Sequence, residues 1–252
     1  MKRYLQLITR DTRVEIFSIL VLLLITAVLR NPKWENIVFP ILSVIIFVLL
    51  DLAFIFLTKK KLFYPFSSLV SGLLIGLIIS PKEGIITIIL VVLAAFLSKH
   101  FIKLRSRHIF NPAAFGILSI SLLKLHSVAS WWSVAQGGPS LIILLLSLLI
   151  LFRLKRVQMP FLFLFGYFLF QLFFQNIHTA ITLTLDGSIF LFSFIMLPEP
   201  MTSIASGVWK YIFGFLVMII FILLYPLHIS FLDPLLLSLF FCNFITKIVT
   251  KN

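Results

Sequence analysis

Ten apolar runs, separated only by short polar stretches, make up almost the whole chain. A membrane-spanning helix needs roughly 20 predominantly apolar residues, with a range of about 17 to 25. The polar stretches between the runs are too short to form a soluble domain. The pattern therefore predicts an all-α polytopic membrane protein of about ten transmembrane segments, at 14–30, 36–57, 66–81, 84–101, 109–124, 131–152, 159–175, 178–197, 211–226 and 229–249.

The composition supports a bilayer environment. The chain is 61% hydrophobic and 12% charged, whereas a soluble domain carries about a quarter of charged residues. Basic residues precede the first apolar run, as in a signal peptide, but no small-residue cleavage site follows the run. We therefore interpret 14–30 as the first span.

The distribution of lysine and arginine predicts the orientation. Cytoplasmic loops are enriched in these residues, and placing the N-terminus inside puts 17 of the 21 on the inner side. This predicts a multi-pass plasma-membrane protein with both termini cytoplasmic. The net charge of +13 comes as short clusters between spans, which favours contact with lipid over a nucleic-acid partner. The inner residues are Lys2, Arg3, Arg10, Arg13, Lys59, Lys60, Lys61, Lys99, Lys103, Arg105, Arg107, Arg153, Lys155, Arg156, Lys210, Lys247 and Lys251.

Matching breaks in the two halves predict an inverted repeat. In each half a small-residue run ends at proline (71–81 and 186–200), and an Asx-Pro pair opens the fifth segment (Asn111-Pro112 and Asp233-Pro234). Five spans per half is an odd number, so the second half enters from the opposite side. We predict a first repeat at 1–130 and a second at 131–252, with a binding site or pathway where the interrupted helices meet.

The residues alone assign no chemistry. The acidic side chains show no pair at catalytic spacing, and for Asp51 and Glu199 a structural role is the default. The five histidines lack metal-ligand spacing, and the single cysteine, Cys242, permits neither an intramolecular disulfide nor an iron–sulfur cluster. No nucleophile elbow, phosphate loop or zinc-protease motif is present. Catalytic residues stay unknown, and no metal is predicted.

Four stretches resemble the RnfD/NqrB family, the membrane subunits of Rnf and Na⁺-translocating NADH:quinone reductase type electron transport complexes. They are SGLLIGL at 71–77, SKH at 98–100, RHIFNPAAFG at 107–116 and MLPEPMTS at 196–203. The resemblance follows the chain in order and implies a urea-channel-like fold of two inverted five-helix repeats. It also implies lining of a flavin site or ion path by Ser71, Gly72, Lys99, Asn111, Pro112, Ala113, Gly187, Ser188, Glu199, Pro200, Thr202 and Ser203.

The chain departs from the family where flavin is normally attached. The family carries FMN on a threonine in the outer loop between the fifth and sixth spans. The corresponding loop here is 125–130, and no threonine occurs between Thr87 and Thr179. Covalent attachment at that place is impossible, so the resemblance implies a short form that binds FMN or riboflavin non-covalently, or that works without flavin.

Three functions remain open at this point. The first is a subunit of an RnfD/NqrB-like complex that couples flavin-mediated electron transfer to ion movement, with other membrane subunits and a flavin or ferredoxin reductase as partners. The second is a channel or carrier for a small polar solute, and the third is a scaffold that only anchors partners. For Lys99 we weigh contact with a flavin phosphate, pairing with Glu199, and a snorkelling position at the inner face.

Overall fold

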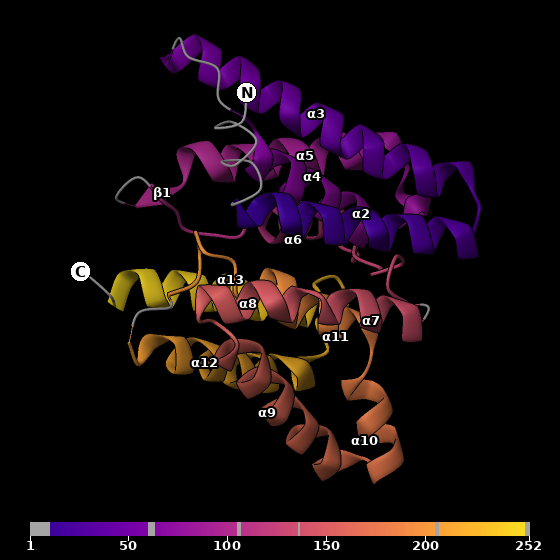
Figure 1. The fold of residues 1–252 in the computed structure, drawn as a ribbon, viewed down its shortest axis with the longest axis vertical. Helices are drawn as coiled ribbons and strands as arrows, with labels where there is room; N and C mark the ends of the chain where they lie inside the picture. Colours follow the sequence, from indigo (N-terminus) through magenta and orange to yellow (C-terminus); the bar gives the residue numbers. More distant parts are fainter. Residues whose placement is uncertain (1–10, 60–63, 105–106, 136, 205–206, 250–252) are drawn as a thin grey trace.

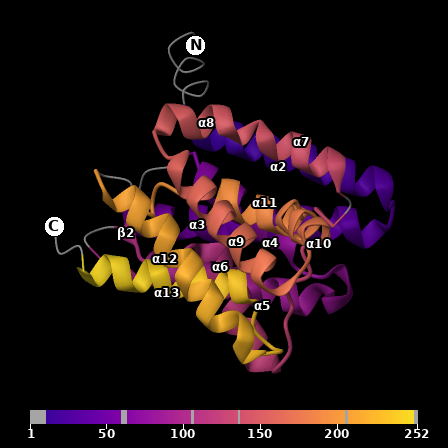
Figure 2. The ribbon, with the colours of Figure 1, turned by 90° about the horizontal axis from the view of Figure 1, so that it is seen from below.

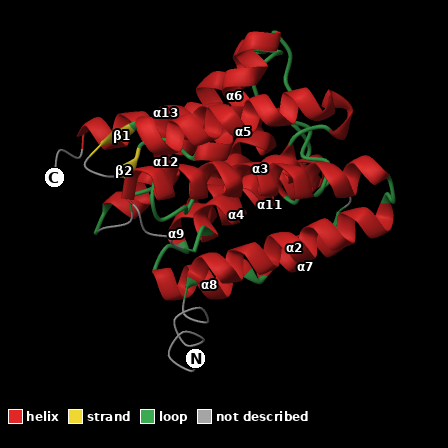
Figure 3. Cartoon of the chain, turned by 90° about the horizontal axis from the view of Figure 1, so that it is seen from above, coloured by secondary structure: helices red, strands yellow, loops and turns green. Residues whose placement is uncertain are grey.

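The computed structural model describes residues 11–59, 64–104, 107–135, 137–204 and 207–249. Several predicted inner-side basic residues lie outside these ranges: Lys2, Arg3, Arg10, Lys60, Lys61, Arg105 and Lys251. Helices make up nearly all of the regular secondary structure of the described chain, which confirms the all-α part of the prediction (Figure 3).

The first half consists of five helices and a small hairpin. The elements are α2 (Thr12–Arg30), α3 (Trp34–Lys59), α4 (Phe66–Ile78), the 3₁₀ turn η1 (Pro81–Glu83), α5 (Gly84–Phe101), strands β1 (Lys103–Leu104) and β2 (Arg107–His108), and α6 (Pro112–Lys124). The antiparallel β1–β2 pair reverses the chain between α5 and α6. This hairpin was not predicted.

The second half is more interrupted. Its elements are α7 (Gly138–Leu145), α8 (Ser147–Leu154), α9 (Gln158–Phe174), α10 (Ile177–Thr184), α11 (Gly187–Leu191), the π-helix η2 (Phe192–Met196), α12 (Trp209–Leu224), the 3₁₀ turn η3 (Tyr225–Leu227) and α13 (Pro234–Val249). The predicted start of the sixth segment at residue 131 is wrong, because Trp131 and Gly137 both have positive φ. A helix cannot pass through these left-handed residues, and it begins only at Gly138.

Both Asx-Pro pairs open a helix, as predicted. The Asn111 side chain accepts a hydrogen bond from the Ala114 amide at 3.0 Å, and the Asp233 side chain accepts one from the Leu236 amide at 3.0 Å. Each side chain satisfies an amide that has no partner within its helix, and the following proline occupies a position that needs no amide hydrogen. These local signals fix where α6 and α13 begin.

The helices of each half pack mainly among themselves (Figure 1). In the first half α4 packs on α2 and α3, and α5 packs on α3 and α6. In the second half α12 packs on α9 and α13. The halves meet where α2 lies beside α7 and α8, and where α6 contacts α13; the first of these contacts is visible in Figures 2 and 3.

Two glycines allow α4 to approach α3 very closely. A Cβ at Gly72 would lie 2.8 Å from the Val44 Cα, and one at Gly76 would lie 2.3 Å from the Pro40 Cα. The Ser43 hydroxyl also donates to the Gly72 carbonyl at 2.7 Å. Small residues at a helix contact are typical of membrane bundles, where packing replaces the hydrophobic effect as the force between helices.

The chain between α6 and α7 covers the C-terminal end of α4. The amides of Ser130 and Trp131 donate to the Ile78 carbonyl at 2.8 and 3.0 Å, and the Trp132 indole donates to the Gly76 carbonyl at 2.9 Å. These bonds satisfy carbonyls that have no partner within the helix. The linker therefore closes this end of the first half.

Four helices in the described residues are long and apolar enough to cross a membrane: Thr12–Arg30, Trp34–Thr58, Pro81–Phe101 and Trp209–Leu227. A fifth span results if Ile177–Thr184 and Gly187–Met196, which are bent by 48°, count as one broken segment. The chain thus has the apolar helices of a membrane protein.

Candidate functional site

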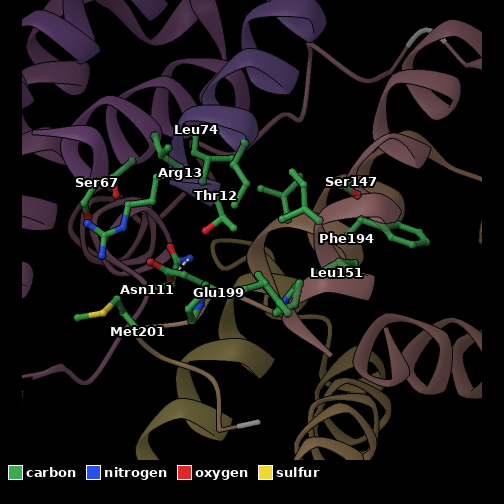
Figure 4. Close-up of a pocket in the computed structure, with 18 of the residues that line it drawn as sticks. Thr12, Arg13, Ser67, Leu74, Asn111, Ser147, Leu151, Phe194, Glu199 and Met201 are labelled. Carbon is green, nitrogen blue, oxygen red and sulfur yellow. Dashed lines mark hydrogen bonds between the residues drawn. The ribbon is translucent and has the colours of Figure 1, made fainter. Parts of the chain in front are cut away.

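A cavity of about 280 Å³ lies between the two halves at the end where α2, α4 and α6 begin (Figure 4). The N-terminal parts of these three helices supply one side of it. The whole of α8 and the segment from η2 to Met201 supply the other. The lining residues are Asp11, Thr12, Arg13, Ile16, Ser67, Val70, Ser71, Leu74, Asn111, Ser147, Ile150, Leu151, Leu154, Phe194, Ile195, Pro198, Glu199, Pro200 and Met201.

Glu199 and Asp11 are the two carboxylates among the lining residues, and residues of both halves hold Glu199. The Asn111 amide donates to Glu199 Oε2 at 2.8 Å, and the Thr202 hydroxyl donates to the same oxygen at 3.1 Å. His108 Nε2 lies 3.7 Å from Oε1. The contact joins Asn111, at the start of α6, to the loop that follows η2 (Figure 4).

Arg156 holds the loop that carries Glu199. Its guanidinium donates to the carbonyl oxygens of Pro198 and Glu199 at 3.0 and 3.4 Å, and also to the Ser203 hydroxyl. Partial burial lowers the pKa of Arg156, and the nearby Glu199 charge opposes that shift. Arg156 nevertheless stays charged at neutral pH, since arginine does not lose its proton in proteins.

The wall of the cavity that α2 and α4 form carries both polar and apolar side chains. Arg13, Ser67 and Ser71 lie there together with Ile16, Val70 and Leu74. Ser71 is 5% exposed, and its hydroxyl has no hydrogen-bond partner among the described residues. Opposite, α8 and η2 contribute aliphatic and aromatic side chains, including Leu151 and Phe194. Such a site suits a compact ligand with one polar edge and one apolar face.

The structure brings together part of the predicted site. Ser71, Asn111, Glu199 and Pro200 line the cavity. Thr202 and Ser203 are buried next to it, bonded to Glu199 and Arg156 as described above.

The other predicted residues have different surroundings. Gly72 packs on α3, and Gly187 packs against the Val134 carbonyl, where a Cβ would lie at 2.1 Å. Ser188 bonds to the Asp186 side chain at the start of α11. Pro112 and Ala113 are buried in the first turn of α6, where they do not line the cavity.

Of the alternatives weighed for Lys99, the structure shows neither pairing with Glu199 nor a snorkelling position. The Lys99 ammonium lies 3.0 Å from Asp51 Oδ2, and only 11% of the Lys99 side chain is exposed. Lys99 forms its ion pair with Asp51 because the two residues lie on α5 and α3, which pack directly against each other. The ion pair makes a flavin phosphate an unnecessary partner for Lys99.

Sequence reasoning did not identify Arg13, Ser67 and Arg156 as site residues. Arg13 and Arg156 were counted only as inner-side charges, and Ser67 carried no motif signal. An adjacent pair of hydroxyls at the start of an apolar run, Ser67-Ser68, is the one sequence signal that points to this wall. In the described parts of the chain, no three His, Cys, Asp or Glu side chains gather as metal ligands.

No protein-family model matches the chain, and a search of curated proteins finds no match.

Proposed function

We propose that the chain is a ten-span membrane protein built from two inverted five-segment halves. Besides the long helices and the bent pair, the described residues hold five shorter apolar helices: Phe66–Ile78, Pro112–Lys124, Gly138–Leu154, Gln158–Phe174 and Pro234–Val249. These coincide with the remaining predicted segments. The contacts between the halves support the repeat, because α2 meets its counterpart α7–α8 and α6 meets its counterpart α13.

A labelling experiment tests this topology. Cys242 is fully buried, so it should stay unreactive towards a membrane-impermeant maleimide in the folded protein. Single cysteines at the exposed positions Lys82 and Lys155 should then react from opposite sides of the membrane. Reaction of both from the same side would rule out the proposed arrangement.

Within this topology, the cavity supports a role as an RnfD/NqrB-like electron-transport subunit. The observation that carries the proposal is the bond between Asn111 and Glu199. Both residues belong to stretches that resemble the family, they come from different halves, and they meet at a cavity. Two motifs that only ended helices at the membrane surface would have no reason to converge there.

The cavity suits non-covalent binding of a flavin ring system. Its volume is near the lower end of about 300–1,000 Å³ for ligand pockets, which fits a ring better than a whole dinucleotide. Ser71, Asn111 and Arg13 offer donors to the polar ring edge, and Leu151 and Phe194 offer an apolar face. A bound flavin would supply one- and two-electron transfer. The chain's own residues would orient it and keep it from water.

Visible absorbance of the purified protein is the direct test. We expect flavin absorbance after purification or after incubation with riboflavin or FMN, and we expect Asn111→Ser and Glu199→Gln to reduce binding at least tenfold. Glu35→Gln, a change outside the cavity lining, is the matched control. Absence of binding in the wild-type protein, with no reductase or membrane subunit on co-purification, would refute the proposal.

A carrier for a small polar solute is the second candidate. It is favoured by the fact that the cavity lies at one end of the molecule, while the linker covers the opposite end of α4. A carrier that alternates between two sides would show such a one-sided cavity. Solute uptake into liposomes by the protein alone, unchanged by reductant, would select this candidate over electron transfer.

A further inference from the structure

A second polar group lies behind the cavity wall and takes no part in the proposed flavin site. Its members are Asp51 on α3, Ser68 on α4, and Lys99 and His100 on α5. We call these four residues the Asp51 cluster. Ser68 directly follows the cavity residue Ser67 in the first turn of α4, so only that turn separates the cluster from the cavity.

Both carboxylate oxygens of Asp51 are occupied. Oδ2 accepts from Lys99 at 3.0 Å and from the Ser68 hydroxyl, while Lys99 also donates to Ser68 at 2.8 Å. Oδ1 lies 2.5 Å from His100 Nε2. Ionisable groups buried within membrane segments are costly and generally serve a function.

This arrangement fixes the histidine tautomer. A carboxylate can only accept, so His100 Nε2 must carry a hydrogen and donate it. In the neutral ring, Nδ1 then carries a lone pair. Nδ1 is buried and has no hydrogen-bond partner among the described residues. Only 8% of the His100 side chain is exposed, so solvent gives little compensation. An unpaired buried acceptor of this kind calls for an explanation.

Two aromatic rings and a carboxylate surround the His100 ring. The rings of Phe54 and Phe96 lie with their centroids 4.3 and 4.7 Å from the imidazole centroid. Aromatic faces attract cations, and the Asp51 carboxylate lies at the opposite nitrogen. Lys99 opposes the added charge.

More distant charges also act on the cluster. Arg13 on α2 and Glu199 on the loop after η2 act on Lys99 with opposite signs. The strand β2, which packs on α5, carries Arg107 and His108. The balance at His100 is therefore between Asp51 and the two rings on one side and the neighbouring cations on the other.

We propose that the Asp51 cluster is a proton-binding site and that the proton is taken up at Nδ1 of His100. The open acceptor is a single buried lone pair, so the ligand must be the smallest cation. Na⁺ or a divalent cation would need several oxygen ligands, and both oxygens of Asp51 are already engaged. Uptake leaves Nε2–H bonded to Asp51 and adds a second N–H, so an imidazolium faces a carboxylate.

Nitrogen NMR of the purified protein tests the site directly. Protein with ¹⁵N-labelled histidine rings, in lipid nanodiscs without added flavin, is titrated between about pH 5 and 8, the range in which histidine commonly changes charge. The His100 signal is the one that His100→Gln removes. We expect a neutral ring protonated at Nε2 at the high end and an imidazolium at the low end. A ring that stays neutral throughout would overturn the proposal.

Two variants separate binding from mere structural pairing. Lys99→Met removes the neighbouring cation and leaves Asp51 with His100, so the pH dependence of the His100 signal should differ from that of the wild type. Asp51→Asn should abolish it. Lys124→Met is the matched control, since Lys124 pairs with Glu83 beside His126; it should alter the His126 signal and leave His100 unchanged. An unaltered His100 signal in Lys99→Met would contradict the proposal, whether or not Asp51→Asn folds. Neither result depends on flavin binding.

Discussion

The side-chain amide of Asn111 donates a 2.8 Å hydrogen bond to the carboxylate of Glu199, across 88 positions of sequence. The same Asn111 side chain accepts the Ala114 amide and so begins α6. Asn111 therefore both starts a helix of the first half and holds Glu199 of the second half.

These two roles of Asn111 can be separated by substitution. Serine is a good helix cap, so Asn111→Ser should lose only the bond to Glu199, at a cost of about 1.5–3 kcal/mol for a bond to a charged group. Asn111→Ala should cost about 1 kcal/mol more through loss of the cap. Unfolding in a denaturing detergent measures both. Asn176→Ser, at the exposed cap of α10, is the control and should change little. Equal stability of Asn111→Ser and wild type would show that the bond contributes nothing.

Arg156 should determine the order of the loop that carries Glu199. Arg156→Gln removes donors to two carbonyl oxygens and to Ser203, so we expect amide hydrogen exchange across residues 198–203 to accelerate at least tenfold. Arg153→Gln is the matched control, because Arg153 forms an ion pair with Glu15 and its own side chain is 54% exposed. Exposed pairs contribute little. Similar exchange in both variants would remove the assigned role of Arg156.

The glycine contacts predict a graded series of destabilised variants. Gly76→Ala and Gly187→Ala would force a methyl group against backbone atoms at 2.3 and 2.1 Å. We expect each to destabilise the protein by about 1–3 kcal/mol. Gly138→Ala meets nothing within 4 Å and should be neutral. Thermal melting in detergent checks the relative stabilities of these variants. A Gly76→Ala protein as stable as Gly138→Ala would mean that α3 and α4 pack less closely than the structure shows.

The bond between the Trp131 indole and Asp233 Oδ2, at 2.7 Å, ties the linker to the start of α13. Trp131→Phe removes the donor. Asp233→Asn keeps the helix cap and removes the charged acceptor. Each should cost about 1.5–3 kcal/mol, and the double variant should cost less than the sum if both changes break one bond. Strict additivity in the melting data would show that the two residues act independently.

The sequence predicted the helix starts that depend on local chemistry. Asn111-Pro112 and Asp233-Pro234 begin helices because cap and proline act within one turn. The predicted start of the sixth segment at residue 131 was wrong, because an apolar run alone does not reveal that Trp131 has a positive φ. The Asp51–Lys99 pair was missed for a different reason: 48 positions separate the residues, and only the packing of α3 on α5 brings them together. Among the residues that line the cavity, the sequence motifs included Asn111 and Glu199. Arg13 and Arg156 belong to no local sequence pattern, so the sequence did not single them out.

The helices α4 and α6 each have 13 residues, which corresponds to about 20 Å. The hydrocarbon core of a bilayer is about 30 Å thick. Since both helices begin at the cavity, the proposed membrane placement would let water approach them from that side, and the transmembrane voltage would drop over a shortened distance. A charge moved along these helices would cross most of the potential, about 2.3 kcal/mol per elementary charge at 100 mV.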